Sequence, residues 1–175
     1  MTSSATPLIT YYLHMTQVSD FSPAFLPPND ALEIKPLLFI DIPFYRFLYH
    51  EVGHQWRWLD RQQWSDERLA DVLNQTTVHI DVLYFQGAPA GYVELNQIED
   101  LVEIAYFGLR PPFLGQGLGK HLLSDGIQKA WQDLGAHKVS VHTCNLDGPH
   151  AYQNYVKRGF SLYETKQEPM PALYK

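Results

Sequence analysis

The order of helical and strand patterns in this 175-residue chain predicts an α+β fold, a mixed α/β sandwich. Three observations support it. Apolar residues recur every four positions from residue 43, three consecutive β-rich segments fill residues 77–109, and helix and strand patterns alternate over residues 117–165. Short turns favour antiparallel strands, whereas a helix between two strands forces a parallel pair. We therefore expect a central, mostly antiparallel sheet flanked by helices, in a single domain over residues 1–175.

The early part of the chain predicts a strand, a loop and two helices. The strand lies at residues 8–15, and prolines in residues 21–30 indicate the loop. A helix starts at Pro43. A second, short helix is predicted over residues 65–73, with Ser65 as a suitable N-cap. One face of the first helix carries Phe44, Leu48, Val52 and Trp56.

The later part predicts the rest of the sheet and two further helices. Residues rich in Val, Ile, Tyr and Phe predict strands at 77–86, 89–98 and 101–109. A helix follows from about Gly117 to Asp133, then a strand at 137–144. Another helix begins near Pro149 and stops at Gly159, where a last strand begins.

Composition indicates a soluble protein and excludes several classes. Thirteen Lys and Arg stand against nineteen Asp and Glu, with no basic cluster, so we expect no nucleic-acid partner. The lone cysteine, Cys144, allows no internal disulfide. The sequence shows neither a signal-peptide pattern nor an apolar run long enough to span a bilayer. A cytoplasmic location without membrane attachment is the expectation.

A glycine-rich turn is the most specific feature of the sequence. In "FGLRPPFLGQGLGKHLL" (107–123), a strand leads into Gly115, Gly117 and Gly119, and a helix begins there. Close-approaching backbone amides and a helix N-terminus form a cradle for phosphate or pyrophosphate. The dinucleotide fingerprint fails because Lys120 replaces its last glycine, and the P-loop fails because His121 replaces Ser or Thr. The alternative is a tightly packed helix entry without a ligand.

This turn resembles the acetyl-CoA motif of the GCN5-related N-acetyltransferase (GNAT) family, (Arg/Gln)-x-x-Gly-x-(Gly/Ala). A second segment, "AYQNYVKRGFSLYE" (151–164), is similar to the family's closing segment, with an alanine, a tyrosine four residues on and Gly-Phe opening a strand. The two motifs come in the family's order, and the resemblance covers roughly residues 77–165. Leu114 departs from the pattern, because the family has Arg or Gln there.

The resemblance implies transfer of acetyl from acetyl-CoA to a primary amine of a small-molecule acceptor, by direct attack in a ternary complex. Backbone groups of Phe107 and Leu109 would hold the pantetheine arm and polarise the thioester carbonyl. Asn145 is nearest to the family's asparagine before the last helix. The pyrophosphate would bind the amides of Gly115, Gln116, Gly117, Leu118, Gly119 and Lys120.

The same resemblance implies that Tyr155 would protonate the departing thiolate. The incoming ammonium must also lose a proton before it attacks. Glu103, on the strand that leads to the glycine-rich turn, and Glu94, on the preceding strand, are the two candidates for this base, acting directly or through water. Each of these residues also has a structural alternative: a core tyrosine or a solvent-facing strand carboxylate. His142 is a further candidate for the base.

Two rival functions remain open. One is a module of the same fold that binds CoA without turnover. The other is a zinc hydrolase, because His50, Glu51 and His54 spell H-E-x-x-H. The metzincin extension fails, since Arg57 and Asp60 occupy its Gly and His positions, and we expect no metal.

The acceptor region is less defined. Five early aromatic residues either line an acceptor site or belong to the core: Tyr45, Tyr49, Trp56, Trp58 and Trp64. The formal charge of -6 favours a cationic small amine as the acceptor. The choice between monomer and homodimer stays open.

Overall fold

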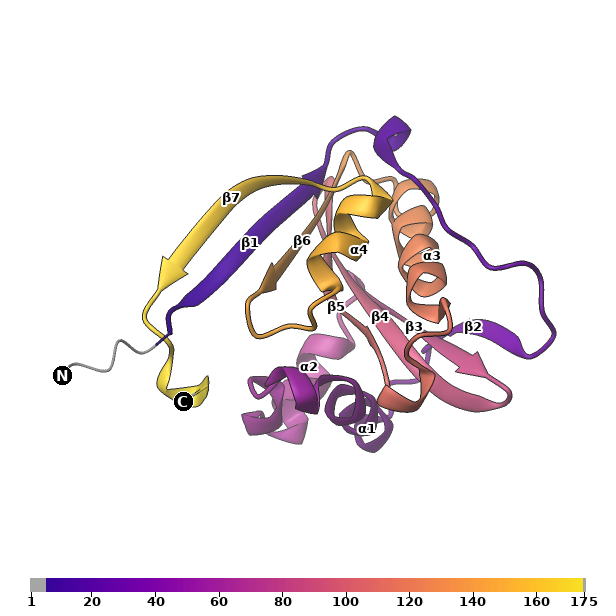
Figure 1. Ribbon diagram of the computed structural model, residues 1–175. Coiled ribbons are helices and arrows are strands. Elements are labelled where there is room, and N and C mark those ends of the chain that lie inside the picture. The colour runs from indigo at the N-terminus through magenta and orange to yellow at the C-terminus, as the bar shows by residue number, and fades with distance from the viewer. Residues whose placement is uncertain (1–5, 175) are drawn as a thin grey trace.

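The computed structural model describes residues 6–174 and contains a seven-stranded sheet flanked by helices (Figure 1). The strands are β1 (Leu8–Met15), β2 (Leu32–Pro36), β3 (Val78–Phe85), β4 (Ala88–Ile98), β5 (Leu101–Leu109), β6 (Lys138–Cys144) and β7 (Ser161–Glu168). The helices are α1 (Ile42–Gly53), α2 (Asp66–Leu73), α3 (Leu118–Gln132) and α4 (Ala151–Arg158). Residues 1–5 and 175, which the predicted domain includes, lie outside the described residues.

The sheet order is β2-β3-β4-β5-β6-β1-β7. Within residues 6–174, neighbouring strands pair antiparallel except β5 and β6, which pair in parallel across the α3 crossover. The predicted fold class, a mixed α+β sandwich with a mostly antiparallel sheet, is therefore confirmed. Across the same residues, we find no helix with the length and apolar character needed to cross a bilayer.

Two elements differ from the sequence prediction. The edge strand β2 was not predicted, because its five residues include charged side chains and end in Pro36. Helix α1 ends at Gly53, and Trp56 lies in a separate 3-10 turn, His54–Trp56. The buried residues of α1 are Tyr45, Leu48, Tyr49, Val52 and Gly53, so its buried face is rotated from the predicted one.

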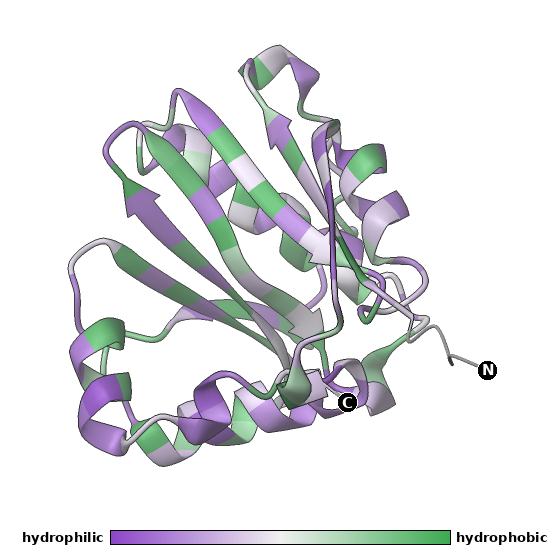
Figure 2. Ribbon diagram, turned by 90° about the vertical axis from the view of Figure 1, so that its left-hand side faces the viewer, coloured by the Kyte–Doolittle hydropathy of each residue, from purple (hydrophilic) through white to green (hydrophobic). Residues whose placement is uncertain are grey.

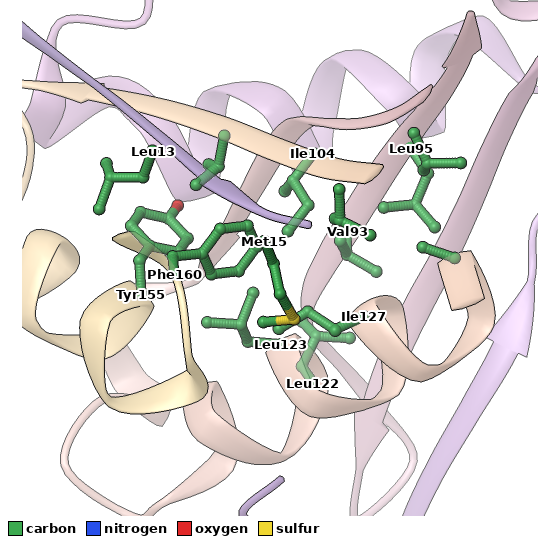
Figure 3. Close-up of a cluster of buried hydrophobic side chains, with 14 of the residues drawn as sticks. Leu13, Met15, Val93, Leu95, Ile104, Leu122, Leu123, Ile127, Tyr155 and Phe160 are labelled. Carbon is green, nitrogen blue, oxygen red and sulfur yellow. The ribbon is translucent and has the colours of Figure 1, made fainter. Parts of the chain in front are cut away.

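The helices cover opposite faces of the sheet, as adjacent residues of β4 show. Val93 packs in a cluster with α3 side chains, whereas Tyr92 packs in a cluster with α1 and α2 side chains. Side chains alternate between faces along a strand, and Figure 2 shows the matching alternation of hydropathy. Figure 3 shows the first cluster, where Leu122 and Ile127 of α3 lie against β4 and β5. We call these the α3/α4 face and the α1/α2 face.

The N-terminal strand β1 lies between β6 and β7 and pairs antiparallel with both. Asn145, just after β6, fixes the start of β1. The Ile9 N–H donates to Asn145 Oδ1 at 2.9 Å, and Asn145 Nδ2 donates to the Pro7 carbonyl at 2.9 Å. Because β1 pairs with one edge of β6, only the other edge, which faces β5, can be left without a pairing strand.

Strands β5 and β6 separate after four paired positions. Their register runs from Leu101 opposite Lys138 to Ile104 opposite Val141, although both strands continue further. The β4–β5 register shifts at the same level, leaving Ala105 as an extra residue on β5. Such a bulge bends its strand and increases the local twist. We call the region beyond Ile104 and Val141 the β5–β6 gap.

The pH dependence of stability should show the electrostatic penalty at Asp125 on α3. Burial, followed by the nearby charge of Asp81, raises the pKa of Asp125 to about 6. Asp81 itself pairs with Lys129, whose Nζ lies 2.7 Å from Asp81 Oδ2. Asp125 is protonated in both folded and unfolded chains below pH 3.8, so its penalty develops as the pH rises toward 6.

We therefore expect Asp125→Asn to raise the free energy of unfolding at pH 7.5 by about 1 kcal/mol, after discounting for solvent screening. The gain should vanish near pH 3.5. Urea denaturation at both pH values measures it, with Asp71→Asn, at an exposed position of α2, as the matched control. An equal gain at the two pH values would contradict this explanation.

Candidate active site

A cavity of about 1160 Å³ opens at the β5–β6 gap. Its lining includes Phe107 and Tyr155, which belong to the α3/α4 face, and Tyr49, Trp58 and Tyr106, which belong to the α1/α2 face. The cavity therefore passes between the two strands and connects the two faces of the sheet. A volume of this size exceeds that of a typical small-ligand pocket and suits two ligands meeting in the gap.

The glycine-rich turn forms one wall, on the α3/α4 face. Gly115 and Gly117 have φ of +75° and +78°, a backbone conformation that favours glycine. Helix α3 begins at Leu118 without a side-chain cap. Among the described residues, the amides of 115–117 donate to no protein acceptor. This wall therefore offers unpaired N–H groups and the positive end of a 15-residue helix, as an anion site requires.

The predicted residues of this turn contribute in different ways. Gly115, Gly117, Gly119 and Lys120 line the cavity. Gln116 lies outside the lining, with Nε2 donating to the Pro112 carbonyl at 3.3 Å.

Two further residues of this turn differ in whether the backbone or the side chain is available to a ligand. The side chain of Leu118 is buried in the core, so only its backbone N–H can serve a ligand. Leu114, at the family's Arg/Gln position, lines the cavity with a half-exposed side chain.

The edge of β5 offers backbone groups to the cavity. The Arg110 N–H donates to the Ala90 carbonyl on β4 at 2.8 Å, so Arg110 points its backbone toward β4. Backbone direction alternates along a strand, and Phe107 and Leu109 therefore point theirs toward the β5–β6 gap. Because β6 no longer pairs there, these groups are free to bind a ligand.

Tyr155 on α4 lines the cavity from the α3/α4 face. Its ring packs edge-on against Phe107, with a centroid separation of 6.1 Å, and against Phe160, with a centroid separation of 6.0 Å. Figure 3 shows Tyr155 beside Phe160. Burial, followed by the charge of Asp147, raises the pKa of Tyr155. The phenol is consequently protonated at neutral pH and can donate a proton into the cavity.

Glu103 on β5 lines the cavity from the α1/α2 face, opposite in direction to its core neighbours Val102 and Ile104. His142 on β6 faces it, with Nδ1 3.4 Å from Glu103 Oε1. The hydrogen bond to Glu103 raises the pKa of His142. A carboxylate and an imidazole thus stand together at the mouth of the gap.

Glu94, the other predicted base, lies outside the cavity lining and is 1% exposed. Arg61 Nη1 lies 2.7 Å from its Oε2, and the Tyr45 hydroxyl donates to the same oxygen at 2.7 Å. The Arg61 guanidinium also stacks 4.4 Å from the centre of the Tyr106 ring. Of the two predicted carboxylates, only Glu103 lines the cavity. Glu94 is buried beneath it and positions Arg61 against the Tyr106 ring.

Aromatic side chains form the wall of the cavity on the α1/α2 face. Tyr49, Trp58 and Tyr106 contact one another, with ring centroids 5.2 to 5.6 Å apart. Trp56 reaches the β6–α4 loop, where a Cβ at Gly148 would lie 3.3 Å from its ring. Three of the five aromatic residues considered from the sequence therefore line the cavity. The other two, Tyr45 and Trp64, pack in the α1/α2 core instead.

Asn145 does not reach the cavity, because its side chain binds the backbone at the start of β1. The neighbouring Asp147 does line it, and its Oδ2 accepts from the Thr143 hydroxyl at 2.5 Å and the Cys144 N–H at 3.0 Å. Sequence reasoning missed several lining residues that lack any local motif: Asp60, Arg61, Tyr106, Asp147 and Tyr174.

The H-E-x-x-H residues lie on the exposed side of α1 and its following turn. His50 and His54 stack with ring centroids 5.1 Å apart, and His54 Nδ1 lies 3.0 Å from the His50 carbonyl oxygen. In the described part of the chain, no group of three or more His, Cys, Asp or Glu residues could hold a metal ion. The zinc alternative therefore lacks its third protein ligand there.

Comparison with solved structures shows the same fold. A GCN5-related N-acetyltransferase from Kribbella flavida has a TM-score of 0.64 and 13% identity, covering 95% of this chain and 61% of that chain. One from Sphaerobacter thermophilus has a TM-score of 0.67 and 14% identity, covering 98% of this chain and 56% of that chain. This chain thus spans less than two thirds of the length of either.

An acetyltransferase from Bacillus subtilis in complex with CoA has a TM-score of 0.58 and 22% identity, covering 76% of this chain and 78% of that chain. No curated protein matches the chain significantly. The profile of the acetyltransferase (GNAT) family matches residues 45–160, which is more than half of the sequence. On that match, together with the shared fold, this chain belongs to the GNAT family of N-acetyltransferases.

Proposed function

We propose that this chain transfers the acetyl group of acetyl-CoA to a primary amine of a small, cationic acceptor, by direct attack in a ternary complex. One observation carries the proposal. The cavity through the β5–β6 gap has unpaired amides and a buried phenol on one face of the sheet, and a carboxylate with an aromatic wall on the other. These are the groups needed to hold a phosphate-bearing cofactor, deprotonate an amine and protonate a leaving group.

The residues present fit acetyl-CoA. The unpaired amides at 115–117 and the N-terminus of α3 would bind its pyrophosphate, with Lys120 beside them. The gap-facing backbone of Phe107 and Leu109 would bind the pantetheine arm. When bound, acetyl-CoA supplies an acetyl group already activated as a thioester.

Glu103 is the proposed general base, acting directly or through water. An alkylammonium must lose a proton before its nitrogen can attack, and Glu103 is the predicted carboxylate that lines the cavity on the α1/α2 face. His142 would orient the Glu103 carboxylate through their contact. Tyr155 would give its hydroxyl proton to the sulfur as the thioester bond breaks, because its raised pKa keeps it protonated until then.

Direct transfer is favoured over an acyl-enzyme on Cys144. Burial, followed by the charge of Asp147, raises the pKa of the Cys144 thiol, which reduces the thiolate fraction at neutral pH. A nucleophilic cysteine needs the opposite environment.

The acceptor class rests on charge. Asp60 and Glu103 line the α1/α2 side of the cavity together with Arg57 and Arg61, the charge of Arg61 is paired with Glu94, and the chain carries a formal charge of -6. The two lining carboxylates and the negative net charge favour a cationic amine. Structures of an aminoglycoside acetyltransferase from a soil metagenomic sample share the fold, at 20% and 21% identity, in complexes with trehalose and with sisomicin. A polyamine or amino sugar is therefore a reasonable first acceptor.

Gly115→Ala should weaken acetyl-CoA binding by about tenfold, because a Cβ at this left-handed position strains the backbone and reorients the amides. Isothermal titration calorimetry with acetyl-CoA measures the effect. Gly87→Ala is the matched control. Gly87 has φ +81°, as Gly115 has φ +75°, and a Cβ added at either position would meet no atom within 4 Å, but Gly87 lies outside the cavity. Equal affinity in both variants would show that the turn does not bind the cofactor.

Glu103→Gln should lower kcat about 100-fold or more while leaving the Kd for acetyl-CoA unchanged, because it removes the general base. Steady-state assays with spermidine and kanamycin as acceptors measure kcat.

Glu94→Gln is the contrasting variant. It leaves Arg61 buried without its charge partner, so it should lower the free energy of unfolding by about 3 kcal/mol, measured by urea denaturation. A fully active Glu103→Gln enzyme would refute the role of Glu103. Acetyl-CoA binding without turnover of any amine would favour the binding-module alternative.

A further inference from the structure

The segment after β7 returns to the cavity. Residues 169–171 leave the edge of the sheet, and a short 3-10 turn, Ala172–Tyr174, follows. In Figure 1 this yellow turn lies below β7, beside the α1–α2 region. Tyr174 lines the cavity together with Cys144 and Asp60.

Two residues between α1 and α2 hold Tyr174 in place. The Tyr174 hydroxyl donates to the Asp60 carboxylate, at 3.0 Å to Oδ1 and 3.1 Å to Oδ2. The Arg57 guanidinium donates to the Tyr174 carbonyl oxygen. Arg57 itself has a φ of 56°, a conformation that non-glycine residues adopt rarely and that is concentrated at functional sites.

We propose that residues 169–174 form a latch that closes the acceptor side of the cavity, with Tyr174 as the residue that limits which amines reach Glu103. The substrate part of this inference rests on the function proposed above. Tyr174 is bound through both its side chain and its backbone, and its partners are cavity residues. Residues 169–174 therefore form part of the cavity wall through Tyr174.

The chemistry of the latch explains how an acceptor could open it. Asp60 holds a neutral phenol, and a carboxylate binds an ammonium more strongly than a neutral hydroxyl. A cationic amine can therefore compete with Tyr174 for Asp60. Because Arg57 and Asp60 are exposed, their bonds to Tyr174 are individually weak, which suits a contact that must open.

Cys144 provides a direct readout of the latch that needs no substrate. It is the sole cysteine of the chain, and it lines the cavity with Tyr174. Burial, followed by the hydrogen bond to Asp60, raises the pKa of Tyr174, and Cys144 is a smaller contributor, as expected for a group that lies close by. A closed latch should slow the reaction of this thiol with 5,5′-dithiobis(2-nitrobenzoate).

We expect Tyr174→Ala to increase the rate of Cys144 modification by about fivefold or more, and Tyr174→Phe to increase it less, because the ring remains. Tyr163→Ala is the matched control and should react as the wild type does. Tyr163 is a half-exposed tyrosine of β7 outside the cavity. Circular dichroism verifies that each variant is folded. A wild-type rate for folded Tyr174→Ala overturns the latch.

Kinetics test the specificity part separately. In Tyr174→Ala, the kcat/KM ratio of the bulky amine kanamycin to 1,5-diaminopentane should rise several-fold, while the KM for acetyl-CoA stays unchanged. An unchanged ratio overturns the role of Tyr174 in specificity. Failure of the proposed acetyl transfer would appear instead as a wild-type protein that turns over no amine, and the thiol rates would still decide whether the latch exists.

Discussion

The parallel pairing of β5 and β6 stops at Ile104 and Val141, and the whole site depends on the separation that follows. The extra residue at Ala105 bends β5 away just where pairing ends. Backbone groups that a continuous sheet would consume are left free at Phe107 and Leu109. The same separation lets one cavity reach both faces of the sheet, as the proposed transfer between a cofactor and an acceptor requires.

The rest of the fold keeps this separation from closing or widening. Strand β1 pairs with both β6 and β7, so β6 is anchored on its outer edge. Beneath the α1/α2 side of the cavity, Arg61 links Glu94, Tyr45 and the face of Tyr106. A buried ion pair adds little net stability but strongly disfavours arrangements that separate its partners. The Arg61–Glu94 pair therefore suits the task of holding the Tyr106 ring in one position.

Much of the fold could be predicted from the sequence because its signals are local. Segments rich in Val, Ile, Tyr and Phe predicted three of the strands. Ser65 was predicted as the N-cap of α2, and it accepts from the Arg68 N–H. Gly159 was predicted to end α4, and it has φ +109°. Strand β2 carried no such signal. It exists because β3 offers it an edge to pair with, which no pattern within residues 32–36 reveals.

The site was predictable where motifs carried it and not where tertiary contacts did. The glycine turn was predicted from its own residues, and Tyr155 from the resemblance of residues 151–164 to the GNAT closing segment; both line the cavity. Glu103 and Glu94 are both strand glutamates and looked equivalent, because what separates them is Arg61, a residue distant in sequence that buries one of them. Tyr174 was missed for the same reason: its partner Asp60 is 114 residues away.

Isothermal titration of chelator-treated protein with acetyl-CoA, with NAD and ATP as controls, tests the central claim most directly. We predict selective binding of acetyl-CoA without added metal, because the unpaired amides and the open edge of β5 match its pyrophosphate and pantetheine arm. A folded protein that does not bind acetyl-CoA would contradict the claim. The glycine turn would then serve only to pack the start of α3.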